Sequence, residues 1–377
     1  MAIDEHAKAP ESIIGPAPAM ASNGGKALKE APTRRFRLVT SGAVKRLAIL
    51  FCVCTVLLVY AWWSMLLMPG HSFRGSLPPL TAEQSALAEE LRSAVTILAD
   101  DTGGVGRVGN RSTFQPRRFA AAAAWIHDQL AQYGYTAINE YPVQRGSPVP
   151  NMEVVVPGTS AASEIVVIGA HYDAFQGTPG ADDNASGVAA CLHLARTYIS
   201  KPQARTLRFV FFVNEEPPAF WTSDMGSWVY AKACRARKDD IVAMLSLESI
   251  GYYSDKPGSQ HYPSPLNLLY PSTGDFIAFV SNYGSRSLNK RALRTFREHA
   301  SFPSEGGSPP AVFPGVGWSD HWSFWQEGYD AIMITDTATF RNPFYHTPND
   351  TVRSLDYERM ARVVDGLKPV IEDLANH

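Results

Sequence analysis

The chain is poor in cysteine and carries almost no net charge. It holds 4 Cys in 377 residues, and 34 Lys+Arg stand against 36 Asp+Glu, a formal net charge of −2. So few cysteines exclude a small domain held together by disulfides. Without a basic excess, the chain is not typical of a nucleic-acid binder, so we expect no nucleic-acid partner. The sequence also has no internal repeat and no glycine-rich phosphate loop.

The few charges are unevenly distributed. Residues 1–46 carry eight Lys/Arg and four acids, so the rest of the chain carries an excess of acids. This segment is rich in Ala, Pro, Gly and Lys and lacks periodicity, which predicts a disordered basic tail. Cys191 and Cys234 fall on predicted helices further along, where a disulfide and two buried free thiols are both compatible with the sequence.

An apolar run of 22 residues without a charge, 47–68, follows the basic tail. At about 1.5 Å per residue, a helix of this length crosses a hydrocarbon core of about 30 Å. Tyr60, Trp62 and Trp63 lie in its C-terminal half, where an interfacial aromatic belt is expected. A buried core helix and a cleaved signal peptide are the alternatives, but the run is longer than a usual signal core. We therefore predict a transmembrane helix over 47–68.

The flanks of this run predict its orientation. Five basic residues precede it closely, whereas Arg74 alone follows it closely. The positive-inside rule then keeps the N-terminus in the cytoplasm and exports residues 69–377. Residues 69–80 are rich in Pro and Gly and read as a linker to a body at 81–377.

The body alternates between strand and helix patterns. Near-continuous apolar runs predict strands covered on both faces at 151–156, 164–170, 206–213, 241–248 and 331–336. Helical patterns lie at 81–98, 115–133, 186–198, 223–235, 274–298 and 356–375. This alternation predicts a single α/β domain with a mixed, mostly parallel central sheet flanked by helices.

Ionisable residues gather where the predicted strands end, which is where open α/β sheets bind ligands. Each residue alone has an ordinary explanation, such as a satisfied histidine, a helix cap or a solvated loop. The six groups lie at strand ends or in adjoining loops, and they are His171, Asp183, Glu215, Glu216, Glu248 and His346. Asp173, two residues after His171, can orient the other ring nitrogen of that histidine. Mixed nitrogen and oxygen ligands without thiolates suit Zn²⁺, with Mn²⁺ or Co²⁺ as second choices. Five ligands and a spare carboxylate fit two metals that share one carboxylate, which predicts metal-assisted hydrolysis.

Six motifs in order resemble metallopeptidase family 28, the di-zinc aminopeptidases related to glutamate carboxypeptidase and glutaminyl cyclase. They extend over roughly residues 80–377 and read GAHYD, GADDNASG, NEE, SLESIG, SDHWSF and FYHTPNDT. The resemblance implies a zinc-exopeptidase domain with two Zn²⁺ per chain. It also implies that His171 and Glu248 complete one zinc site, that Glu216 and His346 complete the other, and that Asp183 bridges them.

The resemblance further implies that Glu215 is the general base and that Asp173 orients His171. The peptide bond after the bridging aspartate is often cis in this family, which here is Asp183–Asn184. Glu248 stands where the family commonly has Asp, although some relatives, including the cyclases, have Glu. Asp320 and His321 match a family motif near the pocket and receive no ligand role.

These observations predict a membrane-anchored, exported aminopeptidase that acts on peptides with a free N-terminus. Three alternatives stay open: a glutaminyl cyclase that uses one zinc, a carboxypeptidase, and a metal-free receptor or binding module. Five aromatic residues could line an apolar side-chain pocket or pack in the core, namely Tyr252, Tyr253, Phe313, Trp318 and Trp322.

Overall fold

The computed structural model describes residues 40–100, 102–143 and 149–377, so most of the predicted basic tail lies outside the described residues. The chain divides into two compact units, Met1–Thr55 and Val56–His377. The second unit contains all the predicted site residues, and we call it the catalytic unit.

The predicted span is a helix in the structure. Helix α1 covers Ser41–Ala61 and continues as the short helix η1, Trp62–Leu66. Together Ser41–Leu66 is long and apolar enough to cross a membrane. The helix begins before residue 47 because Lys45 and Arg46 favour helix and extend it into the basic flank.

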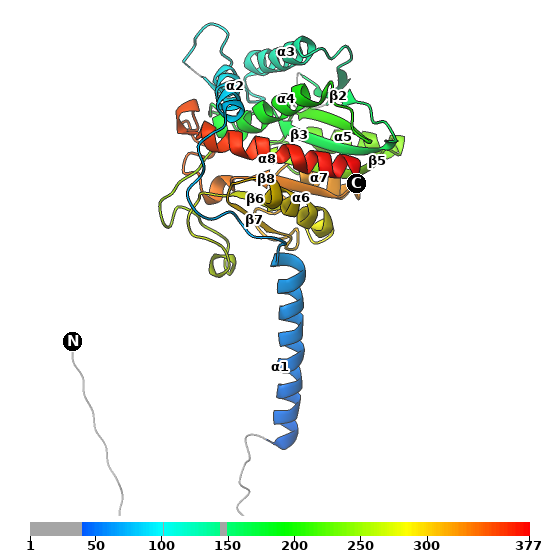
Figure 1. Cartoon of the computed structure of the whole chain (residues 1–377), viewed down its shortest axis with the longest axis vertical. Coiled ribbons are helices and arrows are strands. Elements are labelled where there is room, and N and C mark those ends of the chain that lie inside the picture. The colour runs from blue at the N-terminus through cyan, green and yellow to red at the C-terminus, as the bar shows by residue number, and fades with distance from the viewer. Residues whose placement is uncertain (1–39, 101, 144–148) are drawn as a thin grey trace, which may run out of the picture. The chain divides into compact units, whose positions relative to one another are not determined.

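The described residues of the catalytic unit form an eight-stranded sheet in the order β1-β2-β4-β3-β5-β8-β6-β7 (Figure 1). The pairs β4–β3, β3–β5, β5–β8 and β6–β7 are parallel, and the other three pairs are antiparallel. The predicted mixed, mostly parallel sheet is confirmed. The strands are β1 Asn139–Tyr141, β2 Asn151–Val156, β3 Ala161–His171, β4 Arg205–Phe212, β5 Asp240–Glu248, β6 Ile277–Val280, β7 Ser304–Gly307 and β8 Ala331–Thr335.

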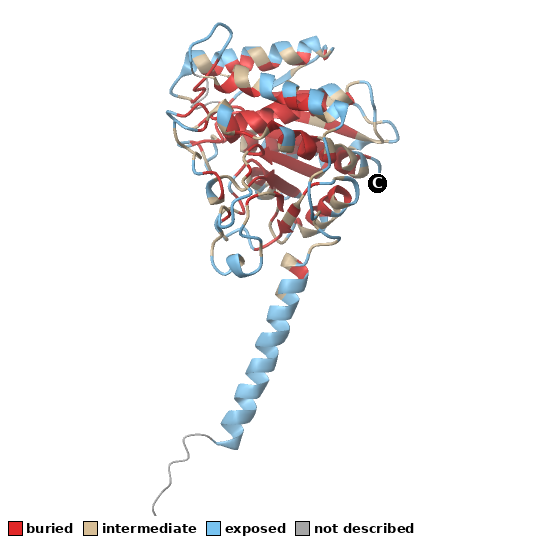
Figure 2. Ribbon diagram, turned by 60° about the vertical axis from the view of Figure 1, so that its left-hand side comes forward, coloured by how far each residue is buried: buried red, intermediate tan, exposed pale blue. Residues whose placement is uncertain are grey.

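Helices pack on both faces of this sheet. They are α2 Ala82–Ala99, α3 Pro116–Gln132, α4 Gly187–Tyr198, α5 Gly226–Arg237, α6 Arg286–His299, α7 His321–Gln326 and α8 Tyr357–Asn376. Successive residues of β3 alternate between two apolar clusters: Val166 packs with α2, α3, α4 and α8, and Val167 packs with α5 and α7. Figure 2 shows the strands in the middle of the catalytic unit as buried, because helices cover both faces of the sheet.

The sheet also separates the two cysteines of the catalytic unit. Cys191 on α4 lies in the first cluster, and Cys234 on α5 lies in the second. Both thiols are buried and free. Of the two readings that the sequence allowed, the structure therefore supports free thiols.

One predicted helix is wrong over part of its length. The sequence predicted a single helix over 274–298, but the structure has strand β6 first and helix α6 only from Arg286. The aromatic and β-branched run 276–280 pairs with β7 and β8, so neighbouring strands decide its conformation. Strands β1 and β7 were not predicted because so few residues show no clear period.

Candidate metal centre

The centre lies where three neighbouring parallel strands end. His171 is the last residue of β3 and Glu248 is the last residue of β5, while Glu215 and Glu216 follow β4. Because β4, β3 and β5 are adjacent and parallel, their carboxyl ends meet at one edge of the sheet. The sheet therefore brings together side chains that lie far apart in the sequence.

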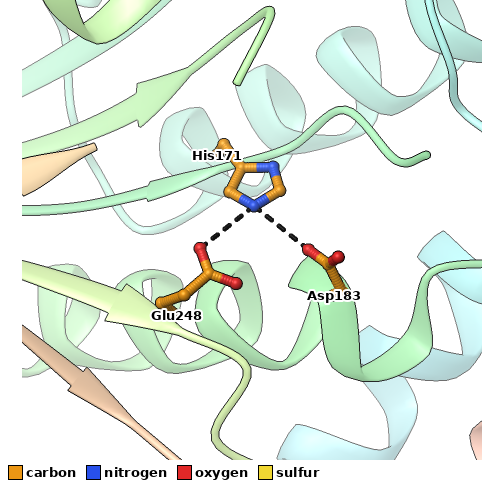
Figure 3. Close-up of side chains that lie close together, drawn as sticks. All are labelled: His171, Asp183 and Glu248. Carbon is orange, nitrogen blue, oxygen red and sulfur yellow. Dashed lines mark ion pairs between the residues drawn. The ribbon is translucent and has the colours of Figure 1, made fainter. Parts of the chain in front are cut away.

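A first group of possible ligands joins His171, Asp183 and Glu248. His171 Nε2 lies 3.2 Å from Asp183 Oδ1 and 3.2 Å from Glu248 Oε2. Figure 3 shows both carboxylates pointing toward this one nitrogen, Asp183 from the short helix η2, Ala181–Ser186, directly before α4, and Glu248 from β5. All three side chains are buried.

A second group joins Asp183, Glu216 and His346. His346 Nε2 lies 2.9 Å from Asp183 Oδ2 and 3.2 Å from Glu216 Oε2. Asp183 thus belongs to both groups and offers one carboxylate oxygen to each. This arrangement matches the bridging place that the family resemblance implies for Asp183.

The backbone around Asp183 is held from several sides. Asp350 accepts hydrogen bonds from the amides of Asp182 at 2.9 Å and of Asp183 at 3.2 Å. Asn184 donates to the Leu247 carbonyl at 2.8 Å, and the Asp183–Asn184 peptide bond is cis, as the resemblance implies. The segment around Asp183 is therefore fixed both to the chain after His346 and to β5.

Asp173 connects His171 with the glutamate pair. Its carboxylate accepts hydrogen bonds from the amides of Glu215 at 3.2 Å and Glu216 at 3.1 Å. Asp173 Oδ1 also lies 3.5 Å from His171 Nδ1. One buried carboxylate therefore holds the backbone after β4 and lies beside the imidazole at the end of β3.

His346 is the most accessible of the possible ligands, with 26% of its side chain exposed. Its ring is stacked between Phe175, at 4.1 Å between centroids, and Tyr345, at 3.9 Å. These two aromatic rings fix the plane of the imidazole and thereby the direction of Nε2.

Glu215 belongs to neither ligand group, although Oε2 lies 3.9 Å from His171 Nε2. The side chain is buried, and this burial raises the pKa of the Glu215 carboxyl well above its ordinary value. His171 opposes the shift, while Glu248 and Glu216 add to it. Glu215 is thus a carboxylate with increased proton affinity beside the possible ligands.

The donor set fits divalent metal ions. Among the described residues, His171 Nε2, His346 Nε2 and Glu216 Oε1 are buried without a hydrogen-bond partner. Burial, and then the neighbouring Asp183, raise the pKa of Glu216 to about 8. Carboxylates buried this closely repel one another unless a cation lies between them. Imidazole and carboxylate ligands without thiolates suit Zn²⁺.

The sequence analysis did not find three residues that support this centre. Arg111 is fully buried and donates to the carbonyls of Pro179 and Gly180, each at 2.7 Å. Asp350 accepts the hydrogen bonds from the Asp182 and Asp183 amides. Ser319 Oγ donates a hydrogen bond to Glu248 Oε2 at 2.8 Å. Asp350 and Ser319 lie inside the quoted motifs, whereas nothing in the local sequence distinguishes Arg111 from a surface arginine.

We expect Arg111→Met to lower the free energy of unfolding by roughly 2–6 kcal/mol, since each stranded carbonyl costs about 1–3 kcal/mol. The Pro179 and Gly180 carbonyls would lose a charged donor in a buried place. Urea unfolding of the detergent-solubilised chain measures the change. Arg117→Met, at an exposed position of α3, is the matched control, and equal unfolding curves for both variants would contradict this role.

We also expect Gly187→Ala to destabilise the protein by about 1–3 kcal/mol through overpacking. A Cβ at Gly187 would lie 2.4 Å from the Leu247 carbonyl oxygen and 2.4 Å from Asn184 Oδ1. Because Asn184 adjoins Asp183, we expect weaker zinc binding as well. Thermal unfolding and zinc titration measure both effects. Gly284→Ala, whose nearest neighbour would be a flexible Asn282 side chain at 3.3 Å, should change neither.

Comparison with known proteins relates this chain to a peptidase family. A family model described as Peptidase family M28 matches residues 151–371. The chain is 37% identical over 255 residues to the uncharacterized protein YfbL of Escherichia coli. This alignment covers 65% of the present chain and 77% of YfbL. It is 29% identical over 209 residues to aminopeptidase YwaD of Bacillus subtilis. This alignment covers 54% of the present chain and only 39% of YwaD.

Solved structures share the fold. LapB from Legionella pneumophila has a TM-score of 0.61 at 24% identity, over 82% of this chain and 79% of that one. A glutaminyl cyclase from Bacteroides thetaiotaomicron has a TM-score of 0.55 at 16% identity, over 79% of this chain and 99% of that one. The family model spans more than half of the chain and its motifs build one site, so the protein belongs to peptidase family M28.

Proposed function

We propose that the protein is a membrane-anchored aminopeptidase that uses two zinc ions. The observation that supports this proposal best is the shared carboxylate of Asp183, which joins two histidine–carboxylate groups. Glu215 stands beside these groups without belonging to either. A chain with a complete ligand set and a free buried carboxylate fits an enzyme better than a metal-free binding module.

In this proposal His171 and Glu248 would hold one ion, Glu216 and His346 would hold the other, and Asp183 would contribute to both. Zinc, when bound, supplies a Lewis acid that polarises a carbonyl and lowers the pKa of water. Glu215 takes the proton of the attacking water and delivers it to the leaving amine. Asp173 positions this base because it holds the Glu215 amide.

An apolar cavity beside Glu248 would take the side chain of the N-terminal residue. Its lining includes Phe276, Met333, Phe340 and Tyr345. Of the five aromatic residues considered from the sequence, Trp318 lines this cavity, while Tyr253 is buried in the core. This supports peptides with an apolar first residue as substrates.

The group of Asp183, Glu216 and His346 favours a two-zinc aminopeptidase over a glutaminyl cyclase. A glutaminyl cyclase of this fold needs one zinc, whereas Asp183, Glu216 and His346 form a further complete group. For the anchor, we propose that the helix over Ser41–Leu66 crosses the membrane with its basic end in the cytoplasm.

The test uses the full chain in detergent with bound metal measured. We expect about two zinc ions per chain and hydrolysis of peptides with a free N-terminus. The same peptides with an acetylated N-terminus serve as the matched control. Equal hydrolysis of free and acetylated peptides would contradict the aminopeptidase assignment, and cyclisation of N-terminal glutamine without hydrolysis would favour the cyclase.

A further inference from the structure

The end of the candidate span is an integral part of the catalytic unit. The Met65 carbonyl accepts a hydrogen bond from the Ser308 amide at 2.8 Å, and the Trp63 carbonyl accepts one from Lys290 Nζ at 3.1 Å. The hydroxyls of Tyr60 and Tyr283 lie 3.1 Å apart. Residues 60–66 are therefore fixed against α6, the loop before it and the end of β7.

The same segment forms a wall of the cavity beside Glu248. Leu66, the last residue of η1, lines this cavity together with Leu266, Tyr270 and Gly307. No residue separates the end of the span from the cavity wall, since Leu66 belongs to both. The cavity thus lies directly beside the place where the chain would leave a membrane.

Two strongly exposed apolar side chains are close in sequence to residues that line this cavity. Leu268 is 80% exposed and lies two residues after the lining residue Leu266 in the short helix η3, Leu266–Leu268. Val312 is 89% exposed and lies between the lining residues Pro309 and Pro314. Exposed apolar side chains gathered at one place mark an interaction site more often than isolated ones do.

Two basic groups lie beside the same segment. Within the described residues, neither Arg286 nor Lys290 forms an ion pair with a carboxylate. The Arg286 guanidinium lies 4.1 Å from the centroid of the Tyr283 ring, and Lys290 Nζ lies 5.7 Å from that of Trp63. Aromatic and basic side chains at the end of a membrane span contact lipid headgroups.

We infer that this span-proximal face, defined by Tyr60, Trp63, Leu268, Arg286, Lys290 and Val312, rests on an anionic lipid surface. The cavity beside Glu248 then opens next to the headgroups. The substrates would be peptides that are themselves held at the membrane, with an apolar N-terminal residue. This inference rests on the proposed aminopeptidase function and adds a substrate class to it.

A fluorescence experiment tests the surface without using activity. The full chain, with Cys52→Ser and Cys54→Ser, is labelled at Val312→Cys and placed in vesicles containing phosphatidylglycerol. Val105→Cys is the matched control, since Val105 is at least as exposed and belongs to the loop between α2 and α3. Figure 1 shows this loop at the end of the catalytic unit away from β7. We expect headgroup-nitroxide lipids to quench the label at 312 several-fold more than at 105, and equal quenching would overturn the inference.

A kinetic experiment tests the substrate class. One peptide with an N-terminal leucine is offered in solution and, with a C-terminal acyl chain, in the same vesicles. We expect Arg286→Glu/Lys290→Glu to lower the rate on the acylated peptide by about 25-fold, since each of the two basic residues contributes about fivefold in affinity near an anionic surface. The rate on the soluble peptide should stay unchanged, as it should on both peptides for Arg117→Glu on α3.

The two failures are distinguishable. An equal loss on both peptides, or no loss on the acylated one, would overturn the membrane-surface inference while leaving the peptidase intact. A wild-type chain that holds zinc but hydrolyses neither peptide would instead contradict the proposed function. In that case the quenching at position 312 still decides whether the span-proximal face contacts lipid.

Discussion

Replacing Glu215 by glutamine should lower kcat on free aminoacyl peptides by about 10²–10⁴-fold, the usual contribution of a general base. Glutamine keeps the size of the side chain but cannot take a proton from water. Because Glu215 lies outside both ligand groups, zinc content should remain that of the wild type. Steady-state kinetics and metal analysis of the same preparation measure both quantities.

The control for this variant is Glu89→Gln, at an exposed position of α2, which should leave kcat unchanged. A Glu215→Gln protein with wild-type kcat would remove the general base from the proposed mechanism. Loss of zinc together with activity would make Glu215 a metal ligand instead, so metal analysis separates the two roles.

Replacing Asp183 by asparagine should have an even broader effect, because both ligand groups depend on its carboxylate. We expect zinc content to fall from about two ions per chain to near zero, and activity to disappear with it. Glu248→Gln should weaken the His171 group alone, and Glu216→Gln the His346 group alone. Isothermal titration with zinc after chelation measures the number of sites and their affinities.

The neighbouring Asp182 provides a matched control for Asp183→Asn. Burial, and then Asp336, raise the pKa of the Asp182 carboxyl well above its ordinary value. Its oxygens accept hydrogen bonds from the Gly251 amide and the Asn342 side chain rather than joining a ligand group. Asp182→Asn should therefore keep its zinc, and retention of both sites in Asp183→Asn would refute the shared carboxylate.

The sequence predicted the central sheet because β3, β4 and β5 contain long apolar runs. Such runs identify a buried strand from the local sequence alone, without knowledge of its neighbours. The family resemblance identified Asp183 rather than Asp182 for the bridging place, and the structure places Asp183 in both ligand groups. The helix prediction was wrong over 274–285, because β6 within this stretch pairs with β7 and β8, and that pairing outweighs the local helical pattern.

The sequence by itself determined which kinds of residue stand at the strand ends, since motif order and residue type are local properties of the chain. Only the tertiary structure decided how they meet. The parallel order β4-β3-β5 brings His171, Glu215 and Glu248 to one edge, and buried Arg111 supports the Asp183 loop from a distant segment. The sequence left open whether Cys191 and Cys234 form a disulfide. In the structure the sheet lies between these two thiols, and both are free. Such contacts arise from packing between distant segments, which no local pattern records.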